Sequence, residues 1–415
     1  MKNRLIVSAC LLVITSVSSL AATKETPVST KWVGSWASSQ LQTEPKDMLS
    51  GDDVTDSTIR QVIRLSAGGK RIRIVFSNAF SNSPLKIDAA NVAVSGDTAS
   101  SRIKADTVQA ITFSGQSEVI IPSGSDYLSD PINMPVAALT SLTISFHVPN
   151  TIQQQTSHPG SRATSYVVKG NRVSDAELGD AKKIDHWYQL AAVHVETDSN
   201  AAAIVTLGDS ITDGRGATTN ANNRWPDFLA ERLQASPRTR NISVLNHGIG
   251  GNRLLQDGLG PNVLARLDRD VIAQPGVKWL IVLEGINDLG TLTREAPVIA
   301  DKHTELVKRM IAAYVQIVAR AHAHNIKVIG ATILPDGASQ YYHPDALNDA
   351  DRNAVNEWIR TPGNFDAFVD LDRIMRDPEH PERLLPAFDS GDGLHPSPAG
   401  FRVMAEAFPL TLFEK

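Results

Sequence analysis

The alternation of apolar and polar residues along the chain changes character once, near residue 200. From residue 32 to residue 195, short runs with a period of two recur every ~10 residues, and turn-forming residues separate them. No long helical pattern intervenes in this part of the sequence. Several short strands at such spacing are typical of a β-sandwich or a jelly roll. We therefore expect an all-β accessory domain over residues 32–200.

Two of these runs predict a hairpin. Residues 58–66 and 70–78 read as strands with partial alternation, and Gly68 and Gly69 lie in the short connection between them. Two strand-like runs joined by a glycine-containing turn indicate antiparallel neighbours. The remaining strands of this domain are predicted at residues 91–95, 108–113, 117–121, 141–148, 163–168 and 187–195.

After residue 200 the pattern becomes one of strands that alternate with helices. A β-α order with nearly continuous apolar strands implies a parallel sheet with helices on both faces. We expect this α/β domain over residues 201–415. Its strands are predicted at residues 201–207, 242–246, 278–284, 326–333 and 366–371. Its helices are predicted from about residue 225 and near residues 261–274, 297–324, 347–360 and 397–409.

The first of these strands ends on a candidate nucleophile. The apolar run stops at Gly208, and Asp209 and Ser210 follow it. Ligands and reacting groups of open α/β sheets collect at the carboxyl ends of the strands. A serine hydroxyl becomes nucleophilic once a neighbouring base takes its proton. The alternative is that Asp209 and Ser210 only cap the next helix, and we assign Asp209 to holding the loop by backbone hydrogen bonds.

Two further loops are rich in hydrogen-bond donors. Residues 246–253 follow the second strand and contain Gly250 and Gly251, and residues 285–288 follow the third strand and contain Asn287. Glycine lets a backbone N–H approach a ligand closely, and an asparagine amide is a neutral donor. Such donors suit the charge on a tetrahedral oxyanion. The alternative for each loop is plain turn formation, and Gly250 remains an alternative to Gly251.

The loop at residues 389–396 holds a candidate base, His395. Asp392 lies three residues earlier and can accept the other ring N–H, which fixes the tautomer and stabilises the imidazolium. Asp389 is the alternative acceptor, although the short spacing favours Asp392. The other reading of this loop is an ordinary aspartate and a histidine ahead of a helix.

The first residues indicate export. Lys2 and Arg4 precede a mostly apolar stretch over residues 5–20, and small residues follow it. This arrangement is typical of a secretory signal peptide, which we assign to residues 1–21, with a polar tail over residues 22–31. The protein would then be periplasmic or secreted, and the mature chain would have no stable membrane span.

Net charge and cysteine content limit the partners and the kinds of site that we expect. The formal net charge of -5 gives no basic footprint for nucleic acid, so we expect no nucleic-acid partner. Cys10 is the only cysteine and lies inside the predicted signal peptide. The mature chain is therefore expected to contain no disulfide and no thiolate metal site.

In combination these motifs resemble those of the SGNH (GDSL) hydrolases. GDSIT with Ser210, the glycine loop with Gly251, GIND with Asn287, and DGLHP with Asp392 and His395 occur in the order of that family. The resemblance spans the whole predicted α/β domain and implies a three-layer α/β/α, flavodoxin-like fold with a parallel sheet. It implies Ser210 as nucleophile, His395 as base and Asp392 as the carboxylate that orients it. It also implies an oxyanion hole formed by the Ser210 N–H, the Gly251 N–H and the Asn287 side chain, with no cofactor and no metal.

The wider sequence is similar to an exported bacterial branch of this family that carries an N-terminal β-domain. Gly393 departs from that branch, in which a bulkier residue is expected, and the departure predicts a looser catalytic loop. Arg224 and Arg253 are candidates to meet an anionic substrate group. Residues 156–158 and 165–166 are candidates to rim the active-site cleft, and Trp187 and Tyr188 are candidates to stack on a sugar. For all of these, structural packing is the alternative.

We expect an exported serine ester hydrolase that works through an acyl-enzyme. The partner would be a small-molecule or polysaccharide ester, and export together with a β-domain favours a carbohydrate O-acetylesterase. One alternative is a lipase or short-chain acyl esterase. The other is a non-catalytic carbohydrate- or phosphate-binding protein on the same fold. The sequence does not specify the oligomeric state.

Overall fold

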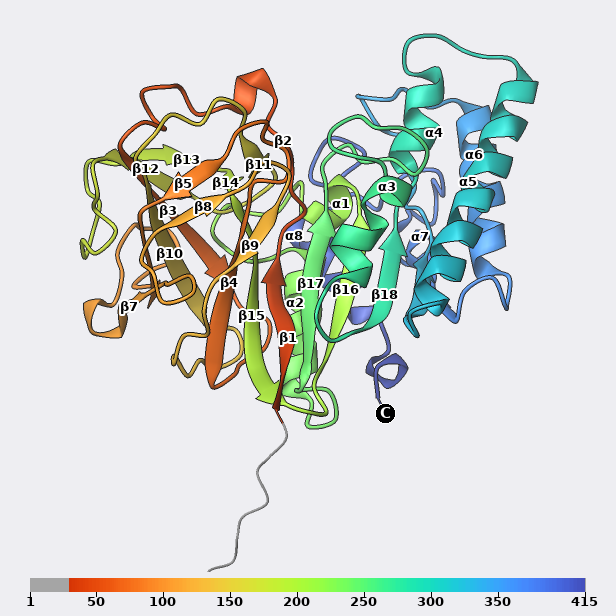
Figure 1. Cartoon of the computed structure of the whole chain (residues 1–415). Helices are drawn as coiled ribbons and strands as arrows, with labels where there is room; N and C mark the ends of the chain where they lie inside the picture. The colour runs from red at the N-terminus through yellow and green to blue at the C-terminus, as the bar shows by residue number, and fades with distance from the viewer. Residues whose placement is uncertain (1–29, 415) are drawn as a thin grey trace, which may run out of the picture.

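The computed structural model of the protein describes residues 30–414 and shows an all-β part beside an α/β part (Figure 1). The first part ends with β15 (Leu190–Asp198), and the second begins with β16 (Ala202–Gly208). We call them the β region (residues 30–198) and the α/β region (residues 201–414). The change from one to the other falls between these two strands.

Two predictions concern the N-terminus. The predicted signal peptide, residues 1–21 with Cys10, lies outside the described residues. The predicted polar tail over residues 22–31 extends too far, because β1 (Thr30–Ala37) already begins at Thr30 and pairs with β15. Within residues 30–414, no helix combines the length and the apolar composition needed to cross a membrane.

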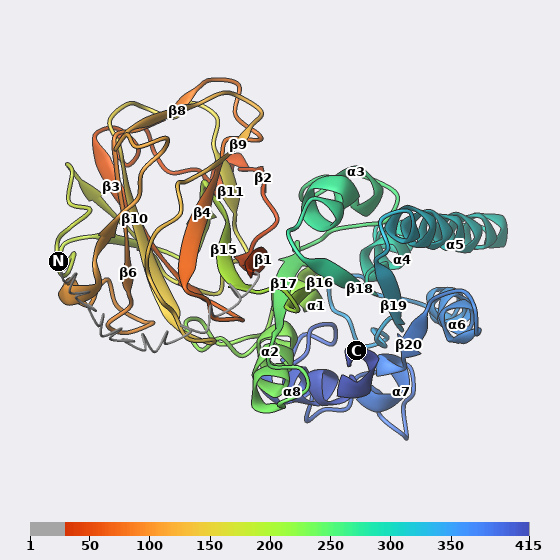
Figure 2. The same cartoon turned by 60° about the horizontal axis from the view of Figure 1, so that its bottom comes forward.

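The β region is a sandwich of two antiparallel sheets (Figure 2). One sheet has the strand order β13-β12-β3-β10-β6-β7, and the other has the order β1-β15-β4-β9. Their apolar side chains share one core, in which the rings of Phe76 and Phe146 lie 5.3 Å apart. The strands of these two sheets are β1 (Thr30–Ala37), β3 (Ser57–Arg64), β4 (Arg71–Ser77), β6 (Ala89–Val94), β7 (Gln109–Ala110), β9 (Asp126–Leu128), β10 (Ser141–Val148), β12 (Ser165–Lys169), β13 (Lys182–Ile184) and β15 (Leu190–Asp198).

Smaller elements complete the β region. One short sheet has the order β14-β11-β2, and β5 pairs with β8. These strands are β2 (Leu41–Gln42), β5 (Leu85–Ile87), β8 (Val119–Ile121), β11 (Thr156–His158) and β14 (Trp187–Tyr188), and two 3₁₀ turns lie at Pro45–Asp47 and Ala105–Thr107.

The predicted hairpin around Gly68 and Gly69 is wrong. β3 pairs with β10 and β12, whereas β4 pairs with β15 and β9, so the two strands belong to different sheets. A Cβ on Gly68 would lie 2.5 Å from the carbonyl oxygen of Val136, and one on Gly69 would lie 2.7 Å from that of Glu196. The two glycines therefore serve a tight crossing from one sheet to the other, which local sequence cannot distinguish from a hairpin turn.

The α/β region is built on a parallel sheet with the strand order β17-β16-β18-β19-β20, as the α/β prediction required. In chain order this is 2-1-3-4-5, the flavodoxin-like arrangement. Strand β16 is buried along its whole length, in keeping with a sheet that is covered on both faces. The strands are β16 (Ala202–Gly208), β17 (Ile242–Gly248), β18 (Val277–Leu283), β19 (Lys327–Ala331) and β20 (Ala367–Val369).

Helices cover both faces of this sheet (Figure 2). Helices α2 and α8 pack together on one face, and α3 and α5 lie on the other, with α6 beside α5. The helices are α1 (Ser210–Asp213), α2 (Trp225–Ala235), α3 (Val263–Leu267), α4 (Ile286–Thr293), α5 (Ala300–His322), α6 (Ala346–Arg360), α7 (Leu371–Met375) and α8 (Pro398–Glu406); a π-helical turn, Asp268–Ile272, continues α3, and a 3₁₀ turn lies at Leu410–Leu412.

Helix α4 corrects the sequence analysis. The segment around Asn287 was expected to be a loop, but Gly285 caps α4 with a φ of 117°, and Asn287 lies in the first helical turn. This conformation favours glycine, because a side chain is strained there. The short amphipathic run that follows Gly285 was too brief to stand out as a helix.

The β region covers an open edge of the parallel sheet. Strand β17 is an edge strand of that sheet, and β1 lies against it (Figure 1). The Ser66 hydroxyl accepts a hydrogen bond from the edge N–H of Val244 at 3.0 Å. Gly34 of β1 packs directly against the Leu245 side chain. Covering an edge in this way satisfies backbone groups that would otherwise face solvent.

Candidate active site

The strand order places the candidate site. The chain leaves the first strand, β16, toward one edge of the sheet and later returns to β18 on its other side. Ligands of such sheets bind at this switch point, beyond the carboxyl ends of the strands. Ser210 follows β16, and Asn287 follows β18, so the topology brings them to the same place.

Ser210, His395 and Asp392 form a continuous hydrogen-bonded chain. The Ser210 Oγ lies 2.8 Å from His395 Nε2, and His395 Nδ1 lies 2.6 Å from Asp392 Oδ2. The other Asp392 oxygen accepts hydrogen bonds from the backbone N–H groups of Leu394 and His395. Burial opposes ionisation, but the hydrogen bonds from the His395 ring and backbone outweigh it and hold the pKa of Asp392 well below its usual range.

The alternative carboxylate, Asp389, has a different position. Its Oδ1 accepts hydrogen bonds from the backbone N–H groups of Gly391 and Gly393, at 2.8 Å and 3.2 Å. It therefore braces the loop, while Asp392 contacts the imidazole. A carboxylate three residues before the histidine is the one that reaches the ring.

Gly393 lies where the catalytic loop passes close to another segment of the chain. Its φ is 72°, and a Cβ at this position would lie 2.1 Å from the carbonyl oxygen of Ala338. The glycine thus allows the loop to pass closely over its neighbour. The close contact explains why glycine is needed at this position, and the looser loop expected from the departure at Gly393 stays a prediction.

The candidate oxyanion donors surround the same pocket. The pocket has a volume of about 430 Å³, and Ser210, Gly250, Gly251, Asn287 and His395 are among its lining residues. Gly251 has a φ of 73°, which favours glycine at that position. Both glycines reach the pocket, so the choice of Gly251 over Gly250 stays a prediction.

Tyr342 orients Asn287, and the sequence analysis missed it. The Tyr342 hydroxyl donates to Asn287 Oδ1 at 2.5 Å, and Asn287 Nδ2 donates to the carbonyl oxygen of Asn252 at 2.7 Å. Burial raises the pKa of the Tyr342 phenol, which therefore stays protonated as a donor. Its ring packs on Gly290, where a Cβ would lie 2.3 Å away. With one N–H of the amide bound to Asn252, the second can point toward the pocket.

The buried side chain of Arg266 holds two loops of the site together. The Arg266 side chain is fully buried and donates to the carbonyl oxygens of Gly208 and His247, at 3.0 Å and 2.7 Å. It also donates to Asn252 Oδ1 and Asp270 Oδ2, both at 3.0 Å. Arg266 thus ties the loop before the nucleophile to the loop of the glycines and to α3.

Three buried carboxyl groups, those of Asp209, Glu284 and Asp288, lie near one another below the site. Asp209 accepts a hydrogen bond from the Ile211 N–H at 2.9 Å and caps α1, which is the loop-holding contact expected for it. Burial raises the pKa of Asp209, and burial together with the charge of Asp209 raises the pKa of Glu284. Burial also raises the pKa of Asp288 to about 6, although its oxygens accept the backbone N–H groups of two loop residues.

The β region contacts the helix that carries Ser210. His158 Nε2 lies 2.8 Å from Asp213 Oδ1, and Asp213 is the last residue of α1. His158 Nδ1 lies 2.8 Å from the carbonyl oxygen of Ser39. A Cβ on Gly160 would lie 1.7 Å from the Asp213 carboxylate, so glycine alone leaves the space. Residues 156–158 are buried supports of α1 and do not rim the cleft.

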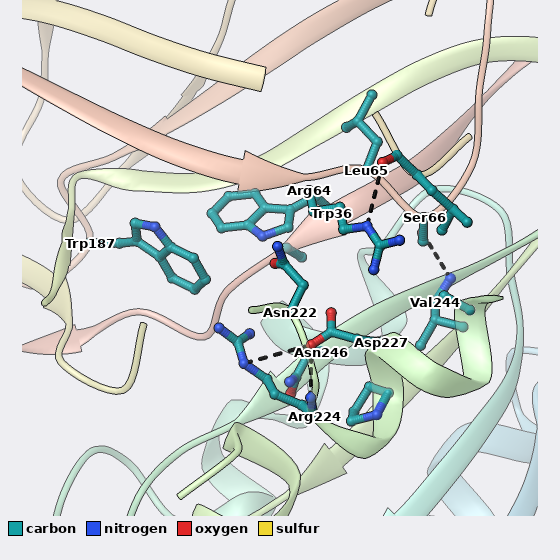
Figure 3. Close-up of a pocket in the computed structure, with 14 residues that line it drawn as sticks. Trp36, Arg64, Leu65, Ser66, Trp187, Asn222, Arg224, Asp227, Val244 and Asn246 are labelled. Atoms are coloured by element: carbon teal, nitrogen blue, oxygen red, sulfur yellow. Dashed lines mark hydrogen bonds and ion pairs between the residues drawn. The ribbon is translucent and has the colours of Figure 1, made fainter. Parts of the chain in front are cut away.

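Trp187 and Arg224 also have structural roles (Figure 3). They line a cavity of only about 30 Å³ between the two regions, which is room for a water molecule and not for a sugar. Trp187 is 3% exposed, and the Arg224 guanidinium lies 5.4 Å from its ring. Arg224 donates to the carbonyl oxygen of Ser161, and Arg253 donates to that of Asp257. Arg224 and Arg253, which were candidates to bind an anionic substrate group, therefore have structural contacts with the backbone.

Known proteins resemble the α/β region. Residues 206–403 match the GDSL-like Lipase/Acylhydrolase family. An acetylxylan esterase of Geobacillus stearothermophilus is 26% identical over 217 residues, which are 49% of this chain and 91% of that protein. A solved catalytic mutant of an acetylxylan esterase from the same organism is 25% identical and covers 51% of this chain and 93% of its own, with a TM-score of 0.38. A putative lipolytic protein of the G-D-S-L family from Desulfitobacterium hafniense is 22% identical and covers 50% and 97%, with a TM-score of 0.37.

The family match and the esterase relative define the class: the protein is a carboxylic ester hydrolase. Its α/β region matches the GDSL-like lipase/acylhydrolase family over residues 206–403. Within residues 30–414, no three His, Cys, Asp or Glu side chains are grouped as ligands for a metal ion.

Proposed function

We propose that Ser210 is the nucleophile of this ester hydrolase, His395 its general base and Asp392 the carboxylate that orients His395. The observation that carries the proposal is the chain of contacts Ser210–His395–Asp392, with distances of 2.8 Å and 2.6 Å. The arrangement has the geometry by which an imidazole activates a serine hydroxyl. The ionised state favoured for Asp392 keeps a negative charge beside the imidazolium that forms.

The reaction proceeds in two acyl-transfer steps. Ser210 Oγ attacks the ester carbonyl carbon while His395 Nε2 takes the hydroxyl proton. The tetrahedral intermediate collapses, and His395 gives that proton to the departing alcohol, which leaves an acyl-enzyme. A water then attacks the acyl carbon, passes a proton to His395, and releases the acid with Ser210 restored.

The oxyanion of each intermediate is held by the N–H of Ser210, the N–H of Gly251 and the Asn287 amide. One such donor typically stabilises the transition state by about 3–4 kcal/mol. Tyr342 is a positioning residue for this set, since it fixes the Asn287 oxygen and thereby aims the amide nitrogen.

Replacing Tyr342 with phenylalanine is expected to lower kcat by about three- to tenfold with little change in KM, because the amide of Asn287 loses one orienting hydrogen bond. Initial rates with 4-nitrophenyl acetate measure this. Tyr127→Phe, in β9 of the β region, serves as the matched loss of a hydroxyl. A kcat equal to that of the wild type would show that Asn287 is oriented without Tyr342.

We further propose that the substrates are O-acetyl esters of carbohydrates. Support comes from the acetylxylan esterase relative, which aligns over 91% of its length. The pocket of about 430 Å³ accepts a small acyl group with part of a sugar. The alternative that we keep is a general short-chain acyl esterase or lipase.

Acetate release from acetylated xylan, compared with turnover of 4-nitrophenyl esters of increasing chain length, tests the substrate class. We expect release of acetate from the polysaccharide and a steep loss of rate beyond short acyl chains. Rates that rise with chain length, together with no acetate from polysaccharide, would contradict the carbohydrate proposal. Ser210→Ala is the blank for each substrate.

Residues 1–21 are proposed to direct export, and the boundary between accessory and hydrolase domains is proposed near residue 200. The change of architecture between β15 and β16 supports the boundary. The charged start and apolar stretch of the N-terminus support export.

A further inference from the structure

Two arginines of the active-site pocket have no partner for their charge. Arg162 and Arg215 line the pocket that contains Ser210 and His395. Within the described part of the chain, neither guanidinium makes a hydrogen bond or an ion pair, and the Arg162 Nε is a buried donor without an acceptor. Buried polar groups are normally hydrogen-bonded, so a guanidinium that lines a substrate pocket and is left unpaired by the protein suits a ligand of opposite charge.

Buried arginines elsewhere in the protein have the hydrogen-bond partners that Arg162 lacks. Arg266 donates to four oxygen-bearing groups besides Ser39, and Arg352 pairs with Asp349 and Asp372. Only Arg162 combines a buried, open guanidinium nitrogen with a position in the catalytic pocket among residues 30–414. Arg224 also has a buried Nε without an acceptor, but it lines the small cavity beside Trp187 and not the catalytic pocket.

The β region holds Arg162 in place. Its backbone has a φ of 49°, in the left-handed region, and its carbonyl oxygen accepts the Asn220 N–H at 2.8 Å. The Asn220 side chain bonds Thr164 through both its oxygen and its nitrogen. These contacts fasten the segment to the loop after α1, so the β region supplies a fixed cation to a pocket that the α/β region builds.

The carboxylates near this cation are already engaged. Asp392 bonds His395, and Asp213 bonds His158. Burial lowers the pKa of Arg162. The positive charges of Arg224 and Arg215 lower it further, and the negative charge of Asp213 only partly offsets them. An anion that entered the pocket would relieve this imbalance and would find open N–H donors.

We propose that Arg162 and Arg215 form a subsite for a carboxylate of the substrate, next to the ester that Ser210 attacks. This inference rests on the proposed function and narrows it to esters that carry an anionic group. The carboxylate can belong to the alcohol, as in a uronic acid residue, or to the acyl group, as in the half-ester of a dicarboxylic acid. Guanidinium groups bind carboxylates in both cases through charge-assisted hydrogen bonds.

Two matched substrate pairs distinguish the sources. Acetylated polygalacturonate and its methyl-esterified form differ in the charge of the alcohol part. The mono-4-nitrophenyl ester of adipic acid and 4-nitrophenyl hexanoate differ in the charge of the acyl part. We expect the wild type to prefer the charged member of one pair by about tenfold in kcat/KM, the usual effect of one hydrogen bond to a charged group.

Arg162→Gln is expected to bring that ratio to about one, and Arg215→Gln, at an exposed position, to lower it about threefold. Arg240→Gln has the same change in net charge at the opposite ends of the strands, ahead of β17, and is expected to leave the ratio unchanged. If Arg162→Gln fails to fold by circular dichroism, Arg215→Gln and the fall of the wild-type ratio with added salt decide the matter.

A wild-type ratio of one or less in both pairs would overturn the subsite, as would a ratio that Arg162→Gln or, when that variant does not fold, Arg215→Gln leaves intact. Failure of the proposed function looks different. In that case 4-nitrophenyl acetate is hydrolysed equally by wild type and Ser210→Ala, whatever the ratios are.

Discussion

Replacing Ser210 with alanine is expected to lower kcat for 4-nitrophenyl acetate by a factor on the order of 10⁴ or more. The attacking oxygen is removed, while the oxyanion donors and the pocket remain. His395→Ala is expected to cost a similar factor, because the hydroxyl then has no base at 2.8 Å. The double variant should lose little more than either single variant, since residues that act as one unit have strongly non-additive effects.

Steady-state rates with purified wild-type and variant proteins give this comparison directly. Ser390→Ala, in the same loop as His395, is the matched control, because its backbone N–H contacts His395 and its hydroxyl has no role in the proposed mechanism. Losses that add in the double variant would show that Ser210 and His395 do not work together. Wild-type rates in Ser210→Ala would place the esterase chemistry elsewhere.

The second large effect concerns stability. Arg266→Met is expected to lower the free energy of unfolding by about 3–5 kcal/mol, since it removes the buried charged donor that the Asp270 carboxylate and the carbonyl oxygens of Gly208 and His247 share. Urea unfolding followed by circular dichroism measures the loss. A decrease below about 1 kcal/mol would mean that the two loops and α3 hold together without this arginine.

Glu284→Gln is the matched control in the same cluster, and it is expected to raise the free energy of unfolding. Glu284 is fully buried, and its Oε2 lies 4.0 Å from Arg266 Nη2 without a hydrogen bond. Burial raises the pKa of Glu284 in the folded protein above its ordinary value. The folded protein is therefore most stable below the ordinary pKa of the carboxyl group, and it loses stability as the pH rises through the raised pKa. The variant is therefore expected to be more stable than the wild type at pH 8, with a smaller difference at pH 5.

Much of the α/β region was predictable because its signals are local. Each strand is a short apolar run, each long helix repeats its apolar residues every three or four positions, and Asp392 and His395 lie within one loop. The hydrogen bond between these two side chains follows from a spacing of three residues. The roles of the residues in catalysis remain predictions for the kinetic variants to test.

The sequence by itself determined the strand and helix order and the candidate chemistry at the strand ends, since both depend on neighbours along the chain. Only the tertiary structure decided that the strands on either side of Gly68 and Gly69 belong to different sheets. It alone brought Tyr342 to Asn287, 55 residues away, and Arg162 to the pocket of Ser210. Such contacts depend on how distant segments pack, and no local pattern of residues records that packing.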